Sequence, residues 1–255
     1  MRALRSPAIG RVELIEIDEP KLEAGHALVR LEHVALCGSD LRRLYYPRPE
    51  DLPLPVGAPG HELIGTIEAV DGADSLQVGQ RALILSPREN SMMERIVAPA
   101  SCVLPLPVGA PGATVEELVL GQQLGTVLWA ARFLQTMMGR TAVVIGQGSA
   151  GLCWNRVLRR LGAARVIALD ITEARVQAAP RFGATHAVNN SRLDAVAAVT
   201  GITGGELPDL VVEACGEPSG INLAVALVRK GGRIQFFGVP HEANFPFDYW
   251  NLFRK

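Results

Sequence analysis

The chain has 255 residues, of which 48% are hydrophobic and 20% charged, and its formal net charge is -1. This apolar fraction is too high for intrinsic disorder, and the balanced charge argues against a broad surface for nucleic acid or anionic lipid. No apolar run approaches the roughly 18 residues of a membrane span. We therefore expect a globular protein that binds neither nucleic acid nor membrane.

The cysteine pattern and the N-terminus bear on the compartment. The four cysteines lie far apart without a CxxC pair, which disfavours a disulfide framework and is typical of a reducing environment. The first 17 residues lack a continuous apolar core, so they indicate a first strand and not a signal peptide. The sequence thus predicts a cytoplasmic protein.

The first hundred residues predict short strands separated by glycine and proline. Segment 12–17 (VELIEI) alternates apolar and acidic residues, as a half-buried strand does. Further strands are expected at 27–31, 64–70, 82–85 and 94–98. Short strands with this punctuation predict a small β-barrel or sandwich.

From residue 114 onward the pattern predicts helices and then alternating strands and helices. Thr114 and Glu117 have capping-box spacing, before a helix over 115–138 that Gly121 and Gly125 are expected to interrupt. Later strands are expected at 141–145, 165–169, 185–188, 209–213 and 233–238. Such alternation predicts an α/β fold with a parallel, doubly wound sheet. We place the domains at 1–125 and 126–255.

A glycine-rich dinucleotide fingerprint follows the strand at 141–145. Its GxGxxG residues are Gly146, Gln147, Gly148, Ser149, Ala150 and Gly151. The first glycine permits a tight turn, the second admits a pyrophosphate near the backbone, and the third lets the next helix pack closely. The N-terminus of that helix attracts the phosphates. Strand, turn and helix in this order predict a nucleotide site.

Asp170 ends the second strand of this unit, 19 residues after Gly151. A carboxylate at this place binds the ribose hydroxyls and repels a 2′-phosphate, so NAD is favoured over NADP. Asp170 also fits a helix N-cap, and the two roles are compatible. Arg175 is the residue that would instead reach a 2′-phosphate.

Two further motifs lie upstream: CGSD at 37–40 and GHE at 60–62. Together with the fingerprint, with VEACG at 212–216 and with KGGRI at 230–234, they make the whole chain resemble the zinc-dependent medium-chain dehydrogenase superfamily of alcohol, sorbitol and threonine dehydrogenases. The resemblance implies a GroES-like, partly open β-barrel as the catalytic domain, followed by a Rossmann domain that lacks its C-terminal part.

The resemblance also implies a catalytic zinc site. Cys37 and His61 match the first two ligands, and Gln122 stands where the family has a glutamate or cysteine as the third. Glu62 matches the carboxylate beside the metal, which can approach or replace the ligand at the open position. With a neutral Gln122, the site carries more positive charge, which lowers the pKa of a bound alcohol but weakens metal retention.

The resemblance assigns roles to four more residues. Asp40 matches the acid that orients the ligating imidazole, and Ser39 matches the hydroxyl that accepts the substrate proton. Cys215 and Gly216 belong to the expected cofactor-binding residues. Arg42 replaces the family's relay histidine, and an arginine does not shuttle protons near neutral pH.

Two regions differ from the family. The segment 86–93 passes almost directly from strand to strand where a four-cysteine lobe would sit, so we expect one catalytic zinc and no structural zinc. Members of the family also continue beyond the position of Lys255 with a sixth strand that commonly forms the dimer interface. We therefore expect a truncated chain. A homo-oligomer is possible, but the missing strand weakens that expectation.

These features predict a zinc-dependent oxidoreductase that transfers hydride between a secondary alcohol or polyol and NAD. Its partner would be that small-molecule substrate. One alternative is a metal-free quinone or enoyl reductase of the same superfamily, which Asp170 and the pair of Cys37 and His61 disfavour. Another is a nucleotide-binding pseudoenzyme, which Gln122 and Arg42 favour.

Overall fold

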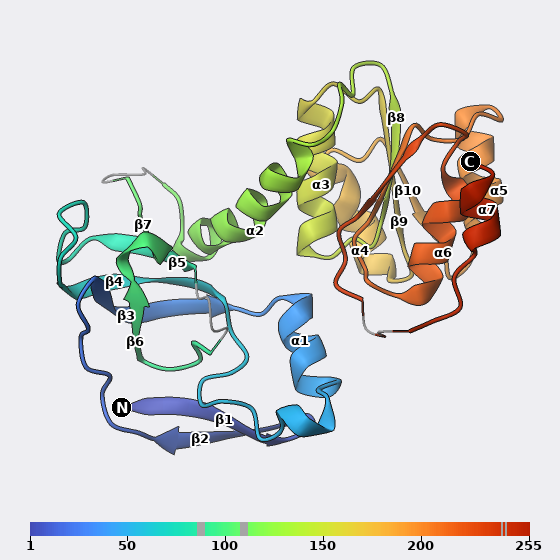
Figure 1. Cartoon of the computed structure of the whole chain (residues 1–255). Helices are drawn as coiled ribbons and strands as arrows, with labels where there is room; N and C mark the ends of the chain where they lie inside the picture. Colours follow the sequence, from blue (N-terminus) through green and yellow to red (C-terminus); the bar gives the residue numbers. More distant parts are fainter. Residues whose placement is uncertain (86–89, 108–111, 241, 243) are drawn as a thin grey trace. The chain divides into compact units, whose positions relative to one another are not determined.

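The computed structural model describes all residues except 86–89, 108–111, 241 and 243 (Figure 1). The chain divides into two compact units, Met1–Gln123 and Leu124–Lys255. This division lies two residues before the boundary placed at residue 125 from the sequence. Each unit is described by itself.

The first unit is built on a five-stranded antiparallel sheet with the strand order β6-β3-β4-β5-β7. Its strands are β3 (His26–Ala35), β4 (Glu62–Val70), β5 (Arg81–Leu85), β6 (Arg95–Pro99) and β7 (Val103–Pro105). In β6, alternate side chains are buried. In β4 and β5, successive side chains are buried, because one face covers the main core and the other packs with Val119 of the helix at 115–131. The predicted strands are confirmed: β3, β4 and β5 are longer than predicted, and β6 is shifted by one residue. β7 was missed because three residues carry no recognisable period.

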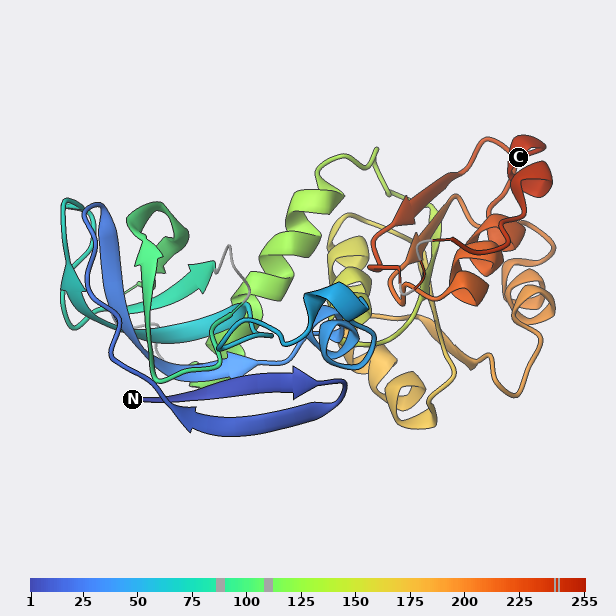
Figure 2. The same ribbon diagram turned by 60° about the horizontal axis from the view of Figure 1, so that its bottom comes forward.

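A two-stranded antiparallel ribbon, β1 (Arg2–Ala8) and β2 (Arg11–Glu16), accompanies this sheet. Figure 2 shows the two strands side by side. Leu4 donates its N–H to the carbonyl of Met92, and Ala3 forms a bridge with Met93. Backbone pairing therefore joins the ribbon to the segment that precedes β6.

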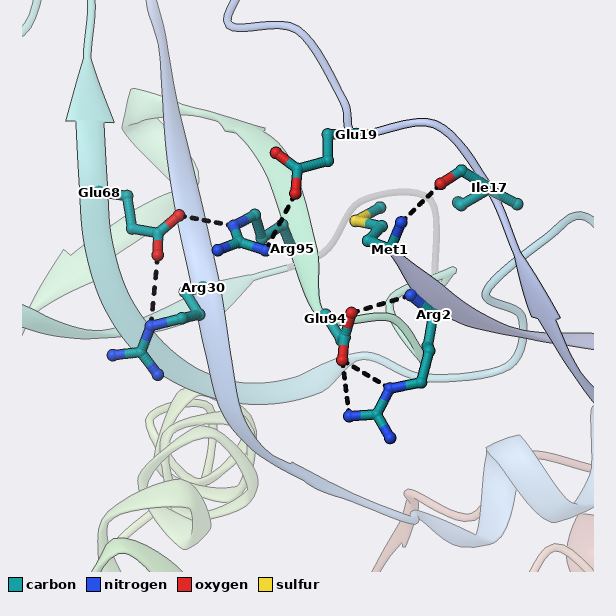
Figure 3. A network of polar contacts seen from close by, with 8 residues as sticks. All are labelled: Met1, Arg2, Ile17, Glu19, Arg30, Glu68, Glu94 and Arg95. Atoms are coloured by element: carbon teal, nitrogen blue, oxygen red, sulfur yellow. Dashed lines mark hydrogen bonds and ion pairs between the residues drawn. The ribbon is translucent and has the colours of Figure 1, made fainter.

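Polar contacts at this junction, within the ribbon and between β6 and β4 accompany the backbone pairing (Figure 3). Arg2 contacts the carboxylate of Glu94 at 2.6 Å. The terminal amine of Met1 donates to the carbonyl of Ile17 over 2.7 Å, and Arg95 contacts Glu68 at 2.8 Å. Exposed pairs of this kind contribute about 0–1 kcal/mol each. Burial of the core, not these pairs, thus stabilises the first unit.

The first unit also contains α1 (Gly38–Tyr45) and short 3₁₀ turns at Pro49–Asp51 and Ala100–Cys102. The next helix, α2 (Val115–Ala131), begins in the first unit and ends in the second. The predicted capping box of α2 is confirmed: Glu117 donates its N–H to Thr114, whose own N–H donates to the Glu117 carboxylate.

The predicted interruptions of this helix were wrong, because α2 runs through Gly121 and Gly125 and ends seven residues before 138. A glycine costs a helix only about 1 kcal/mol. Burial of Val119 and Val127 on one side of α2 offsets that cost.

The second unit contains a five-stranded parallel sheet with the order β10-β9-β8-β11-β12. All five predicted strands are confirmed, with small shifts of their ends: β8 (Thr141–Ile145), β9 (Arg165–Asp170), β10 (His186–Asn189), β11 (Leu210–Glu213) and β12 (Arg233–Phe236). The order runs outward from β8 in both directions, which is the doubly wound arrangement predicted from the sequence.

Helices cover both faces of this sheet (Figure 1). They are α3 (Ser149–Arg160), α4 (Glu173–Ala178), a 3₁₀ turn at Ala179–Phe182, α5 (Ala195–Thr203), α6 (Pro218–Leu227) and α7 (Tyr249–Phe253). Along β8, Val144 packs with Trp154 of α3, whereas Val143 packs with Val199 of α5. Successive side chains thus point to opposite faces, and both are buried, as in sheets with two covering layers.

This topology brings three loops together at the carboxyl edge of the sheet. The glycine loop follows β8, Asp170 ends β9, and Cys215 follows β11. Because β8 and β11 are neighbours at which the strand order reverses, a crevice for a ligand is expected there. Among the described residues, no helix is long and apolar enough to cross a membrane.

Candidate functional site

The start of α1 fixes the first candidate metal ligand. Cys37 is the N-cap of α1, and its N–H donates to Oδ2 of Asp40 over 2.9 Å. Asp40 is only 2% exposed, and its other oxygen, Oδ1, lies 2.9 Å from Nδ1 of His61. One carboxylate therefore caps the helix and holds the imidazole.

Gly60 and β4 position the next two candidate ligands. Gly60 adopts φ of +151°, a conformation that residues with a side chain rarely adopt, and His61 and Glu62 follow it directly. One ligand atom from each of Cys37, His61 and Glu62 lies within 4.8 Å of the others. Two motifs that are 20 residues apart in the chain thus meet at one place.

Burial and hydrogen bonds set the charges of this cluster. The hydrogen bond with Asp40, followed by that with Cys37, raises the pKa of His61 to about 10. Burial raises the pKa of the Glu62 carboxyl above its ordinary value. A metal ion therefore has to displace protons from this cluster when it binds.

The donor set fits zinc. A thiolate, an imidazole and a carboxylate are the three ligand types that zinc takes in proteins. Asp40 engages Nδ1 of His61, so Nε2 is the ring nitrogen left for a metal. Each predicted member of the cluster except Gln122 is therefore in a suitable position.

The glutamine at the cluster is the neighbour of the predicted one. Oε1 of Gln123 lies 3.6 Å from Sγ of Cys37, and Gln123 is 6% exposed. Gln123 follows Val119 by four residues in α2 and precedes Val127 by four, so all three lie on the buried side of the helix. This four-residue spacing along α2 is the sequence signal that distinguishes Gln123 from Gln122.

Ser39 and Arg42 lie on the same short helix as the cluster. Ser39 is the second residue of α1, two positions after Cys37, and is partly exposed. Arg42 is half-buried, and its Nε has no hydrogen-bond partner within the described part of the chain. Its guanidinium stays charged at all ordinary pH values, so it offers positive charge and no proton transfer.

The glycine loop has the geometry that its sequence predicts. Gly146 adopts φ of +88°, and Gly148 is the N-cap of α3. A Cβ on Gly151 would lie 1.8 Å from the carbonyl oxygen of Gly146, so the helix approaches the turn more closely than any side chain allows. The first N–H groups of α3 thus face outward from a tight turn, as phosphate binding requires.

The carboxylate of Asp170 holds this loop from the neighbouring strand. Its Oδ2 accepts the N–H of Gln147 over 2.6 Å, and its Oδ1 accepts the N–H of Thr172 over 2.7 Å. Arg175 approaches Oδ2 at 3.7 Å. Each oxygen retains a lone pair for a further donor.

The side chain of Gln147 is buried in the interior of the unit and forms its hydrogen bonds there. It is 1% exposed, donates to the carbonyl of Val144 over 2.9 Å and accepts from Asn155 over 2.7 Å. Gln147 therefore ties the loop to β8 and α3. Ser149 and Ala150 occupy the first two positions of α3.

Glu213 is a residue of this crevice that the sequence reasoning passed over. It is fully buried, and its Oε1 accepts the N–H groups of Cys215 over 2.6 Å and Gly216 over 2.7 Å. Burial, then the hydrogen bond with Glu213, raises the pKa of the Cys215 thiol to about 12. A charged residue at the end of an apolar strand was the available signal.

No second group of three metal-binding side chains is found in the described residues. The segment in which we predicted the absence of a structural zinc lobe, 86–93, lies partly outside them, because 86–89 are not described.

Comparisons with known proteins agree with both halves of the structure. A family model for the alcohol dehydrogenase GroES-like domain matches residues 23–128, and one for zinc-binding dehydrogenases matches residues 150–255. The chain belongs to the zinc-dependent medium-chain dehydrogenase superfamily. Its two units are accordingly the GroES-like and Rossmann parts of that superfamily, as the resemblance implied.

Individual relatives are distant. Sorbitol dehydrogenase of Bacillus subtilis is 26% identical over 92% of this chain and 74% of its own length. L-threonine 3-dehydrogenase of the same organism is 28% identical over 94% and 76%. Among solved structures, the alcohol dehydrogenase TADH from Thermus sp. ATN1 is 29% identical with a TM-score of 0.84, over 100% of this chain and 82% of its own. At these identities, the comparisons support a dehydrogenase and leave its substrate open.

Proposed function

We propose that this dehydrogenase transfers hydride between a secondary alcohol or polyol and NAD, with one catalytic zinc ion. The observation that carries the proposal is the cluster of Cys37, His61 and Glu62, with Asp40 behind the imidazole. When bound, zinc supplies Lewis-acid polarisation of a hydroxyl, and NAD accepts the hydride.

The chain's own residues hold the reactants and move the proton. Cys37 and His61 bind the metal, and Asp40 fixes the tautomer and direction of the imidazole. Gln123, in place of the predicted Gln122, contributes a neutral amide oxygen beside Cys37. Ser39 accepts the proton of the substrate hydroxyl. Because Arg42 does not relay protons, that proton passes to water or to the cofactor ribose.

NAD is the proposed cofactor because of Asp170. A carboxylate at this place repels a 2′-phosphate and accepts hydrogen bonds from ribose hydroxyls. Arg175, 3.7 Å from the carboxylate, is the residue that NADP would use. The glycine loop, Cys215 and Gly216 are the proposed backbone contacts of the cofactor.

The test is an assay of the oxidation of a panel of polyols and secondary alcohols, with NAD or with NADP. The absorbance of the reduced cofactor measures the rate. We expect turnover with NAD that is lost in Cys37→Ala and retained in the control Cys102→Ala. Equal turnover in wild type and Cys37→Ala would contradict the zinc mechanism and favour the metal-free reductase.

A nucleotide-binding pseudoenzyme is the second candidate. Two features favour it: the neutral amide of Gln123, where the family has a charged ligand, and the arginine at position 42. NAD binding without oxidation of any substrate in the panel, by protein that retains zinc, would support this candidate over the dehydrogenase.

A further inference from the structure

The Rossmann unit has a charged cavity on the edge of the sheet opposite the glycine loop. Its volume is about 210 Å³, and Arg140, Asp209, Arg229 and Arg233 line it. Arg140 directly precedes β8, Asp209 directly precedes β11, and Arg233 is the first residue of β12. The cavity thus lies where the amino ends of three neighbouring strands meet.

The cavity is separated from the nucleotide loop by the length of the sheet. β8 has five residues between Arg140 and Gly146, and a parallel strand rises about 3.3 Å per residue. The two edges are therefore roughly 16 Å apart. A ligand in this cavity would not touch the residues proposed to bind the cofactor.

Asp209, the carboxylate side chain among the described residues that line the cavity, is already engaged on both oxygens. Oδ2 of Asp209 accepts the N–H of Thr141 over 2.9 Å, and Oδ1 accepts Nε of Arg229 over 2.9 Å. Burial alone would raise the pKa of Asp209, but these two hydrogen bonds and the charges of Arg229 and Arg140 hold it below its ordinary value. Asp209 is thus a charged acceptor that positions Arg229.

The arginines keep most of their donors for a ligand. Nη1 of Arg229 donates to the carbonyl of Lys230 over 2.8 Å, and Nη1 of Arg233 donates to the carbonyl of Phe133 over 2.7 Å. Arg140 makes no side-chain hydrogen bond or ion pair with any described residue. Each guanidinium has five N–H donors, so the majority in the cavity are unused within the described chain.

Charge and size define the ligand. Three guanidinium groups against one carboxylate leave two positive charges in excess, which matches the charge of a phosphate group near neutral pH. Guanidinium groups bind phosphate oxygens in a bidentate manner. The volume equals that of about seven water molecules, which is enough for a phosphate and a short carbon chain. We propose that this cavity binds a phosphate or a small phosphate monoester, at a site distinct from the nucleotide loop.

Isothermal titration of the chain with inorganic phosphate, at an ionic strength held constant with sodium chloride, tests the proposal. We expect wild type to bind phosphate and Arg140→Gln to bind it at least about tenfold more weakly, the loss typical of one charged hydrogen bond. Arg181→Gln removes the same charge outside the cavity and is the matched control. Because the Arg140 side chain has no hydrogen bond to lose within the described chain, the variant should fold, which circular dichroism verifies.

Amide NMR spectra separate this site from the nucleotide loop, which also attracts phosphate. Phosphate should shift the signals of Gly231 and Gly232, and these shifts should vanish in Arg140→Gln while shifts at Gly146 and Gly148 persist. Shifts confined to the glycine loop, equal weakening in Arg181→Gln, or tighter binding of malonate than of phosphate would each overturn the proposal.

Discussion

Asp40 and His61 are joined by a hydrogen bond of 2.9 Å between Oδ1 and Nδ1, and the second oxygen of the same carboxylate accepts the N–H of Cys37. Asp40 therefore links Cys37, at the start of α1, to His61, which directly precedes β4. Two of the proposed zinc ligands depend on it.

Replacing Asp40 should weaken zinc binding without removing a ligand. In Asp40→Asn the imidazole loses a charged partner, and we expect about 10–100-fold lower zinc affinity, as is usual when such a partner is removed. Competition with a chromophoric chelator measures the affinity. Asp51→Asn, an exposed carboxylate paired with Arg48, is the control and should bind zinc as wild type does. Unchanged affinity in Asp40→Asn would show that the imidazole is oriented by other means.

The two adjacent glutamines of α2 should respond differently to the same change. Gln123→Glu places a charged oxygen beside Cys37, and we expect zinc to bind roughly tenfold or more tightly, which corresponds to about 1.4 kcal/mol. Gln122→Glu should leave the affinity near that of wild type. The reverse order of effects would return the third ligand to Gln122, as predicted from the sequence. Chelator competition at a single pH compares both variants.

The glycine loop should tolerate no side chain at its third glycine. In Gly151→Ala the new Cβ collides with the carbonyl of Gly146, so the loop has to shift. Overpacking of this kind costs about 1–3 kcal/mol, and we expect NAD affinity, measured by calorimetry, to fall at least about tenfold.

The matched control for Gly151→Ala is Gly201→Ala. Position 201 is inside α5, and no atom would lie within 4 Å of the new Cβ. The free energy of unfolding should rise by up to about 1 kcal/mol, because alanine favours helix, and NAD affinity should stay unchanged. Normal NAD binding by Gly151→Ala would exclude the tight turn as the cofactor site.

The thiol of Cys215 should be inert to alkylation at moderate pH. With its pKa raised to about 12 by burial and by Glu213, roughly one molecule in three thousand carries the thiolate at pH 8.5. Iodoacetamide and peptide mass spectrometry should find Cys102 modified and Cys215 intact. Labelling of Cys215 should increase as the pH rises toward 12, or in Glu213→Gln, where the carboxylate no longer opposes ionisation. Equal labelling of both cysteines at pH 8.5 would contradict the raised pKa of the Cys215 thiol.

The sequence predicted the Rossmann unit in more detail than the barrel. Three strands of the parallel sheet, β8, β9 and β11, contain a continuous apolar run that is followed directly by Gly146, Asp170 and Glu213, and this signal is local. β7 and α1, in contrast, are short, and their places depend on pairing with distant residues. Period-2 patterns alone could not assign the strand order β6-β3-β4-β5-β7.

The candidate site was predictable where motif residues carry their own geometry. Cys37, Asp40 and His61 meet because a helix start and a glycine turn are both encoded in their motifs. Gln122 was chosen by its place in the segment that matches the family's third ligand, whereas the structure places Gln123, one position later, beside Cys37. Glu213 stands out in the sequence as a charged residue that ends an apolar strand, but its partners, the backbone N–H groups of Cys215 and Gly216, are not encoded in any residue pattern.

Elemental mass spectrometry of the monodisperse protein tests the proposed zinc mechanism most directly. The structure leads us to expect about one zinc per chain in wild type and in Cys102→Ala, and none in Cys37→Ala, because Cys37 supplies the thiolate of the described cluster. Zinc-free wild-type protein after supplementation, or the same zinc content in Cys37→Ala, would contradict the zinc site and the dehydrogenase mechanism built on it.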